Sequence, residues 1–205
     1  MSLEEKLANL LAEVGFPKLT SAQAVNFSNY LELFLKWNQK TNLSAVRDED
    51  EILRRHILES IQCARLLPAG LSSLLDFGSG GGLPGIPISI LHPEIEVTLG
   101  ESQIKKATFL NEVVRTLGLN AKVHSARAEQ LTAKFSCVTL RAVDKMPEAI
   151  LAATNLLGPG GWLVLMTSAA DSSPHQTAAG PSFSWQPPAT IQRSDSRLIL
   201  LGQKS

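Results

Sequence analysis

Apolar residues in the first seventy positions recur at steps of three and four, the spacing of amphipathic helices. Leu3, Leu7 and Leu11 begin one such series, which stops at Gly15. A second helix is capped by Thr20 or Ser21 and carries apolar positions at Phe27, Leu31, Phe34 and Leu35. A third opens near Asp48 and ends before Pro68. Residues 1–70 are therefore predicted to form an N-terminal helical cap.

From Ser73 onward, short apolar runs alternate with helical stretches. The predicted strands are residues 74–77, 95–99, 121–125, 137–140, 162–166 and 197–201. Helices are predicted after Pro84, over residues 102–117 and after Pro147. This alternation predicts an α/β fold, with a doubly wound, mostly parallel sheet, over residues 71–205 as one compact unit with the cap. Residues 171–190 hold four Ser and four Pro and are predicted to be an irregular loop.

Composition narrows the class of protein. The chain has 205 residues, of which 44% are hydrophobic, enough for one large core. Its two cysteines, Cys63 and Cys137, lie far apart, so we expect neither a disulfide framework nor a metal site. The N-terminus lacks the pattern of a signal peptide and no stretch is long enough to span a bilayer, so we expect a cytoplasmic protein without membrane contact.

Charge argues against binding nucleic acid with the whole surface, because 19 basic residues balance 19 acidic ones. Nucleic-acid binding would require local clusters of cations. The candidates are Lys36, Lys40, Arg47, Arg54 and Arg55, with Arg127, Arg141 and Lys145 further along the chain. The alternative is an ordinary mixed-charge surface.

The strongest chemical signal is the glycine cluster that follows the first predicted strand. Asp76 lies near the end of this strand, and Gly78, Gly80 and Gly82 follow, where glycine permits a tight turn and close approach of a ligand. Glu101 ends the second strand, where a carboxylate can accept hydrogen bonds from both hydroxyls of a ribose. Together they predict a cofactor that contains adenosine.

The glycine spacing also fits the dinucleotide fingerprint, so an NAD-dependent oxidoreductase is an alternative. Asp76 argues against it, because a carboxylate would repel a pyrophosphate but suits a sulfonium and an amino group. The chain is also too short for the substrate domain that many dehydrogenases carry.

The chain resembles the ribosomal RNA small-subunit methyltransferase G family, also called glucose-inhibited division protein B, from about Tyr30 to Met166. The run Gly-Leu-Pro-Gly-Ile-Pro that ends at Pro87 is far more specific than a generic glycine loop. The other shared motifs are Lys36-Trp37-Asn38, Asn42-Leu43, Arg55 to Ser60, Arg127-Ala128-Glu129 and Leu140-Arg141-Ala142.

The resemblance implies a class I, Rossmann-like methyltransferase that uses S-adenosyl-L-methionine (AdoMet), releases S-adenosyl-L-homocysteine and needs no metal. The implied acceptor is N7 of one guanine in the decoding-site loop of 16S rRNA, within free RNA or the small ribosomal subunit, and we expect a monomer. With the residues argued above, the expected cofactor contacts are Asp76, Gly78, Gly80, Leu83, Glu101, Ala128, Glu129 and Arg141. The expected RNA contacts are Arg54, Arg55, Lys145 and Arg197.

Two departures from the family pattern bear on the substrate. Thr167-Ser168 stands where the family commonly has Lys-Gly, which removes one expected contact to RNA or substrate. Glu59 replaces the usual Asp and keeps a carboxylate.

Guanine N7 is already a nucleophile, so the predicted chemistry needs orientation and no general base. We therefore assign Arg141 to positioning, with a structural ion pair as the alternative. Tyr30 and Trp37 are interpreted as core residues in preference to platforms for RNA bases. For His56 we expect a hydrogen bond that links the cap to the glycine loop, in preference to a catalytic role.

Three other functions stay open on the sequence. They are a methyltransferase acting on a small molecule or a protein, an NAD-dependent oxidoreductase, and a regulator that binds AdoMet without transferring a methyl group.

Overall fold

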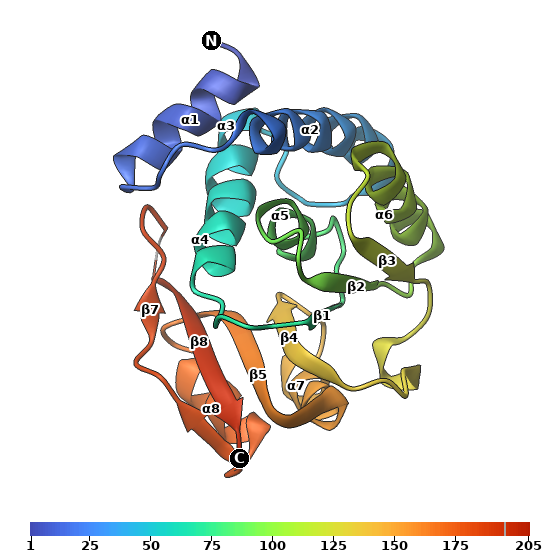
Figure 1. The fold of residues 1–205 in the computed structure, drawn as a ribbon, viewed down its shortest axis with the longest axis vertical. Helices are drawn as coiled ribbons and strands as arrows, with labels where there is room; N and C mark the ends of the chain where they lie inside the picture. Colours follow the sequence, from blue (N-terminus) through green and yellow to red (C-terminus); the bar gives the residue numbers. More distant parts are fainter. Residues whose placement is uncertain (195) are drawn as a thin grey trace.

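The computed structural model describes residues 1–194 and 196–205, which form a single sheet covered by helices (Figure 1). Five strands are parallel: β1 (Ser73–Phe77), β2 (Glu96–Gly100), β3 (Ala121–His124), β4 (Phe135–Arg141) and β5 (Leu157–Ser168). Three antiparallel strands complete the sheet: β8 (Arg197–Lys204), β6 (Phe183–Trp185) and β7 (Ala189–Thr190). The order is β3-β2-β1-β4-β5-β8-β6, with β7 also paired to β8, which confirms the doubly wound, mostly parallel sheet.

The N-terminal cap contains α1 (Leu3–Glu13), α2 (Ser21–Thr41), α3 (Glu49–Ile52), η1 (Leu53–Leu58) and α4 (Glu59–Arg65). Of the two predicted capping residues, Thr20 caps α2, and its hydroxyl accepts a hydrogen bond from the backbone N–H of Gln23. Asp48 caps α3 in the same way. The third predicted helix is continuous, but its middle section, η1, is a π-helical turn that the apolar spacing did not predict.

The remaining helices lie on the two faces of the sheet (Figure 1). They are α5 (Gly85–Leu91), α6 (Ile104–Leu117), the short 3₁₀ helix η2 (Ala128–Gln130), α7 (Met146–Leu156) and α8 (Ser172–Ala179). The cap helices, α5 and α6 lie on one face, and α7 and α8 lie on the other. No helix among the described residues is long and apolar enough to cross a membrane.

The prediction of an irregular loop over residues 171–190 is wrong, because this segment holds α8, β6 and β7. Its prolines occupy permitted places: Pro174 lies in the first turn of α8, where a missing N–H breaks no helical hydrogen bond. Pro181, Pro187 and Pro188 fall between the elements. The prolines therefore mark the ends and first turns of elements and do not indicate irregular structure throughout the segment.

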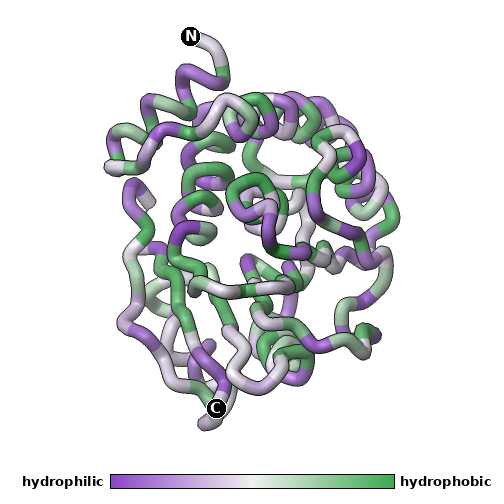
Figure 2. Tube along the Cα trace, viewed as in Figure 1, coloured by the Kyte–Doolittle hydropathy of each residue, from purple (hydrophilic) through white to green (hydrophobic). Residues whose placement is uncertain are grey.

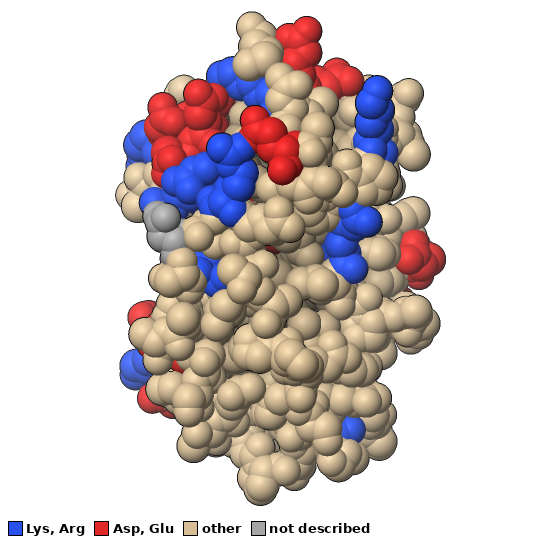
Figure 3. Space-filling view, turned by 90° about the vertical axis from the view of Figure 1, so that its left-hand side faces the viewer, with Lys and Arg blue, Asp and Glu red and all other residues tan. Residues whose placement is uncertain are grey.

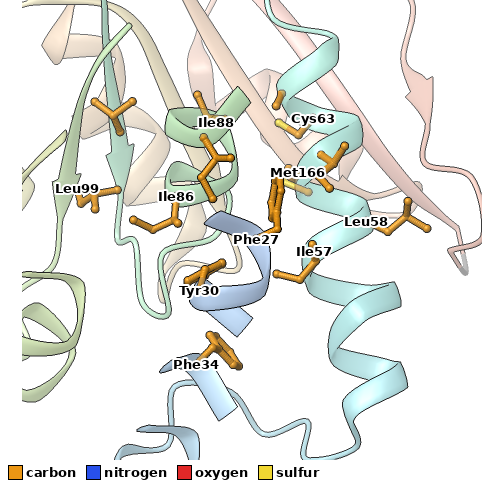
Figure 4. Close-up of a cluster of buried hydrophobic side chains, with 14 of the residues drawn as sticks. Phe27, Tyr30, Phe34, Ile57, Leu58, Cys63, Ile86, Ile88, Leu99 and Met166 are labelled. Carbon is orange, nitrogen blue, oxygen red and sulfur yellow. The ribbon is translucent and has the colours of Figure 1, made fainter. Parts of the chain in front are cut away.

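The cap and the sheet share one core. Phe27, Tyr30 and Phe34 of α2 point toward Ile57 on the third cap helix and toward Ile86 on α5 (Figure 4). All five side chains are fully buried. Along the chain, hydrophobic positions form continuous runs in the central strands and alternate with polar ones in the cap helices (Figure 2). Because this cluster continues across the boundary at residue 70, the cap contributes directly to the core that supports the glycine turn.

Candidate functional site

The glycine cluster forms a tight turn at the carboxyl end of β1. Gly78 has φ +73°, a conformation that side chains rarely adopt, and a methyl group added there would lie 3.1 Å from Val143. Gly82 has φ +87° and packs so closely that an added methyl group would lie 2.5 Å from Ile86. The turn therefore requires glycine for both its backbone conformation and its packing.

Asp76 fastens this turn to the elements around it. Its Oδ2 accepts a hydrogen bond from the backbone N–H of Gly85 (3.1 Å), and its Oδ1 accepts one from the Thr139 hydroxyl (2.9 Å). Burial raises the pKa of this carboxyl to about 6, although these hydrogen bonds act in the opposite direction. The Asp76 side chain points into the protein between β1, β4 and the start of α5.

Glu101 joins the end of β2 to the glycine turn. Its Oε2 accepts from the backbone N–H of Gly80 (2.9 Å), and its Oε1 accepts from that of Gln103 (2.7 Å). A carboxylate oxygen can accept two hydrogen bonds, so each oxygen keeps a position for a ligand hydroxyl. The side chain is held in place at the rim of a pocket.

This pocket, of about 410 Å³, lies at the carboxyl ends of β1, β2 and β4. In open α/β sheets this edge is the usual ligand site. Its lining brings together six residues named from the sequence: Gly78, Glu101, Arg127, Ala128, Glu129 and Lys145. Lys145 was predicted to contact RNA, but the structure places it among the predicted cofactor residues. Val143, Asp144 and Glu148 also line the pocket, and the sequence analysis missed them because no motif marks them.

The other predicted cofactor residues lie outside this lining. Asp76 is buried beneath the turn, and Gly80 contributes its N–H to Glu101. Leu83 packs against the core cluster shared with the cap. Arg141 points from the end of β4 into the cap.

Arg141 connects the sheet to the cap through several hydrogen bonds from one guanidinium group. Its Nη2 donates to Glu59 Oε2 (2.9 Å) and to the backbone oxygen of Arg55 (2.5 Å), and its Nη1 donates to the Ser60 hydroxyl (3.3 Å). The Arg55 carbonyl lies within the π-helical turn. Only 8% of the Arg141 side chain and 3% of the Glu59 side chain are exposed, so this is a buried ion pair.

His56 does not contact the glycine turn, contrary to the expectation from the sequence. Its Nε2 lies 2.6 Å from the Ser44 hydroxyl and its Nδ1 lies 3.3 Å from Arg141 Nη2. Tyr30 instead links the cap to the turn, because its buried hydroxyl donates to the Gly81 carbonyl (2.6 Å). The burial of Tyr30 confirms it as a core residue. Trp37 is half-buried, and its Nε1 donates to Glu112.

The predicted RNA-binding arginines gather around the π-helical turn. Arg54 is paired with Glu51 (2.8 Å), and Arg55 lies 3.8 Å from the same residue. Arg197 of β8 lies 3.8 Å from Glu59. On the face formed by α1, α4 and β7, basic and acidic side chains are mixed over the upper half, and the lower half is largely uncharged (Figure 3). On this face, positive charge is therefore confined mainly to the upper half and does not cover the whole surface.

Thr167 and Ser168 at the end of β5 are both engaged. The Thr167 hydroxyl lies 2.8 Å from His175 Nδ1, and the Ser168 hydroxyl donates to Asp171. Within the described residues, no group of three or more His, Cys, Asp or Glu side chains is arranged to hold a metal ion.

The strand order, the glycine turn after β1 and the acidic residue after β2 define a class I AdoMet-dependent methyltransferase fold. Solved structures with this fold include a predicted O-methyltransferase from Agrobacterium tumefaciens, with a TM-score of 0.61 and 19% identity, covering 71% of this chain and 80% of that one. A ribosomal protein L11 methylase from Lactobacillus delbrueckii has a TM-score of 0.58 at 15% identity, covering 72% and 77%.

The sequence comparisons define the family more narrowly. Residues 23–182 match the family described as GidB, rRNA small subunit methyltransferase G. The ribosomal RNA small subunit methyltransferase G of Stenotrophomonas maltophilia K279a is 40% identical over 188 residues, covering 90% of this chain and 85% of the relative. That of Xanthomonas axonopodis is 41% identical over 170 residues, covering 82% and 78%. The chain belongs to the rRNA small subunit methyltransferase G family.

Proposed function

We propose that this protein transfers a methyl group from AdoMet to N7 of a guanine in the decoding-site loop of 16S rRNA. S-adenosyl-L-homocysteine is the product, the small ribosomal subunit or its RNA is the partner, and the enzyme acts in the cytoplasm as a monomer. The observation that carries the proposal is the meeting of Gly78 and Glu101 on one pocket, in a chain of this family.

The residues around the pocket fit AdoMet. The two Glu101 oxygens each keep an acceptor position for a ribose hydroxyl, and the bare backbone at Gly78 allows a ligand to approach closely. Ala128 and Glu129 on η2 line the same pocket and would flank the adenine. AdoMet, when bound, supplies the electrophilic methyl group; this chain supplies the orientation.

Guanine N7 carries a lone pair, so no residue has to remove a proton before transfer. Correct placement of the two reactants can supply several kcal/mol, about 7 to 11 at best. Positive charge builds up on the base as the methyl group arrives, so a free cation next to the base would oppose the reaction. Arg141 is not such a free cation, because its charge is paired with Glu59 inside the protein. We propose that Arg141 positions the end of β4 against the cap.

The RNA contacts are proposed for Arg54, Arg55 and Arg197 around the π-helical turn, and for Lys145 at the pocket. RNA is read most easily in loops, where bases can be splayed out of the stack. Lys145 lines the pocket, and Arg55 and Arg197 lie by Glu51 and Glu59 of the third cap helix, so we propose that these cations hold phosphates of the RNA loop and do not contact the reacting base.

Small subunits that lack the modification, incubated with labelled AdoMet, test the proposal. The label should appear on one guanine, mapped by cleavage specific for 7-methylguanosine followed by reverse transcription. Label on another nucleotide would keep the enzyme class and overturn the assigned acceptor. AdoMet binding without any transfer to RNA would favour another substrate or a regulatory role.

The cofactor site is tested with two variants that each place a side chain at positive φ. At Gly78 (+73°) and at Gly118 (+62°) the backbone strain should cost about 1 kcal/mol, and in Gly78→Ala the contact with Val143 at 3.1 Å should add to it. Only Gly78→Ala also fills space near the pocket, since the methyl group at Gly118 meets nothing within 4 Å. Calorimetry should show a loss of AdoMet affinity of at least about tenfold for Gly78→Ala alone. Equal affinities would exclude this turn as the site.

A further inference from the structure

The Lys36-Trp37-Asn38 motif lies where the C-terminal end of α2 packs on α6 (Figure 1). Trp37 is half-buried, and its Nε1 donates to Glu112 Oε2 of α6 at 3.0 Å. Asn38 is buried, and both ends of its side-chain amide bond to the backbone of the loop that follows α2. These two residues are therefore structural, whereas Lys36 is exposed and has no structural contact of this kind.

A cavity of about 260 Å³ opens between the two helices. Its lining, which we call the α2–α6 groove, consists of Lys36, Trp37, Lys40, Thr41 and Glu112. Lys36 and Lys40 lie one helical turn apart, and both are exposed. Within the part of the chain that the structure describes, neither lysine forms an ion pair or a side-chain hydrogen bond. Glu112 is held by Trp37, so both ammonium groups are available to an anion from outside.

Positive charge is concentrated on α2 and α6. Together the two helices carry five basic residues and two acidic ones, in a chain whose formal net charge is zero. The third cap helix, which carries Arg54 and Arg55, holds four acidic and three basic residues, and both arginines lie beside Glu51. The local excess of positive charge that RNA binding requires therefore lies on α2 and α6.

One side of α6 leads from the cofactor pocket to this groove. Gln103 lines the pocket, and α6 begins at the next residue. Lys105, Phe109 and Glu112 then follow at helical spacing and share one side of the helix. This side faces α2, because the last two residues contact Trp37. At 1.5 Å per residue, Glu112 lies about 12 Å along the helix from its start, a distance that a short stretch of RNA can span.

We propose that the α2–α6 groove binds the phosphate backbone of the substrate RNA, with Lys36 and Lys40 each contacting a phosphate. Lys105 contacts a third phosphate, between the groove and the cofactor pocket. The proposal rests on the proposed function, because it takes RNA as the partner. Contacts of this kind position the strand and carry no sequence information, so the groove holds the RNA while its target base enters the pocket.

RNA fits this surface better than an acidic protein does. An ammonium group is a compact point charge that suits phosphate oxygens. RNA brings one phosphate with every nucleotide, so a row of unpaired cations along two helices matches its regular spacing. A protein partner would instead have to supply carboxylates in this same row.

Lys36→Gln and Lys40→Gln test the phosphate contacts, with Lys18→Gln as the matched control. Lys18 is also an exposed lysine of the cap without an ion pair among the described residues. It precedes the first turn of α2, about 30 Å along this helix from Lys40. Filter binding to 16S rRNA freed of ribosomal proteins, between roughly 50 and 200 mM salt, measures the affinity. Each groove variant should reduce the slope of log K against log salt concentration by about 1, and Lys18→Gln should leave it unchanged.

Glu112→Gln should have the opposite effect on RNA affinity. The amide oxygen of glutamine can still accept the hydrogen bond from Trp37, so the packing is kept while the negative charge beside the lysines is lost. Affinity for the protein-free RNA should rise, by up to about fivefold at low salt. A groove with a merely structural role would show no such gain.

Steady-state methylation of unmodified small subunits separates binding from chemistry. Lys36→Gln and Lys40→Gln should raise the KM for subunits severalfold and leave kcat within about twofold of the unchanged protein, as expected for a lost contact that is equal in the ground and transition states. Calorimetry should show unchanged AdoMet affinity in both variants.

The proposal is overturned if both groove variants keep the salt slope of Lys18→Gln, or if Glu112→Gln weakens RNA binding. A lower kcat at unchanged KM would also overturn it. If the lysine variants bind protein-free RNA normally but whole subunits weakly, the groove contacts a ribosomal protein and the proposal is wrong. Failure of the proposed function gives a different pattern: the unchanged protein itself would leave guanine N7 of the subunits unlabelled, whatever its affinity for RNA.

Discussion

Arg141 and Glu59 form an ion pair whose removal affects the whole cap. Both side chains are almost fully excluded from water, so removing Arg141 leaves the Glu59 carboxylate buried with only the more distant Arg197, at 3.8 Å, to offset its charge. The same guanidinium also donates to the Arg55 carbonyl within the π-helical turn. This arrangement matches the structural alternative weighed from the sequence for Arg141. Its position at the end of β4 could be predicted, but its direction into the cap could not.

Arg141→Met is expected to destabilise the protein by about 3 to 5 kcal/mol, because it leaves the Glu59 carboxylate without its partner. Urea denaturation followed by circular dichroism measures the change. Arg55→Met, at a side chain that is 43% exposed and 3.8 Å from Glu51, is the control and should cost less than about 1 kcal/mol. If both variants lose the same free energy of unfolding, the buried ion pair contributes no more to stability than the exposed one.

His56 makes stability depend on pH. Burial lowers its pKa from 6.5 to about 4, so the unfolded chain takes up this proton first as the pH falls. The free energy of unfolding should therefore decrease between pH 6.5 and 4. Asp76 acts in the opposite direction: its pKa is raised from 3.8 to about 6, and the folded protein takes up that proton first, which stabilises it over a similar range.

The two contributions are separable by substitution. In urea titrations between pH 7 and 4, His56→Gln should lose less stability on acidification than the unchanged protein. Asp76→Asn should lose more. If both variants follow the pH profile of the unchanged protein, the two groups titrate normally in the fold.

Among the elements, α2 has the most direct connection to the glycine turn. Its apolar face packs on α5, and Tyr30 adds a buried hydrogen bond to the Gly81 carbonyl. The periodicity of the chain was enough to predict this helix and its buried face, and the residue types narrowed the cap to Thr20 or Ser21. It could not predict which loop the face would cover, because that depends on how the cap sits on the sheet.

Tyr30→Phe keeps the ring and removes the hydroxyl, which leaves the Gly81 carbonyl without this donor. The expected loss is about 1 to 3 kcal/mol in the free energy of unfolding, measured by urea denaturation. Trp37→Phe serves as control, because its lost hydrogen bond is to Glu112, a partly exposed partner. A loss in Tyr30→Phe no larger than that in Trp37→Phe would contradict the link to the turn.

At the scale of the whole molecule, the sequence predicted the class of fold and the edge of the sheet that carries the pocket. Strands ending at Phe77 and Gly100 place Gly78 and Glu101 side by side in any parallel sheet of this order. The contacts of Arg141 and His56 could not be predicted from the sequence. Arg141 pairs with Glu59, some eighty residues away, and His56 bonds to Ser44, twelve residues away. Long-range side-chain contacts of this kind leave no periodic trace in the sequence.

With no net charge overall, affinity for RNA must come from a few local cations. Arg55→Ala should reduce the slope of log K for small subunits against log salt concentration by about 1, as expected for one lost phosphate contact. Lys122→Ala is the control, because Lys122 pairs with Glu96 at the β2–β3 edge, away from the π-helical turn. Filter binding between 50 and 200 mM salt, roughly the range over which phosphate contacts are most visible, measures both. If Arg55→Ala and Lys122→Ala show the same slope, Arg55 makes no phosphate contact with the RNA.

The π-helical turn has a consequence for how the family can vary. Such a turn is equivalent to a single residue inserted into an ordinary α-helix, and the chain absorbs it by widening one coil. Because the extra residue is absorbed within the turn, the helical segments on either side keep their phase. Ile52 and Ile61, nine positions apart, would lie on opposite sides of a regular α-helix at about 100° per residue, yet both are buried here. Deleting one residue within the turn should therefore restore a regular helix and leave both isoleucines facing the interior, so the length of the chain at this point can differ by one residue without changing which side chains face the core.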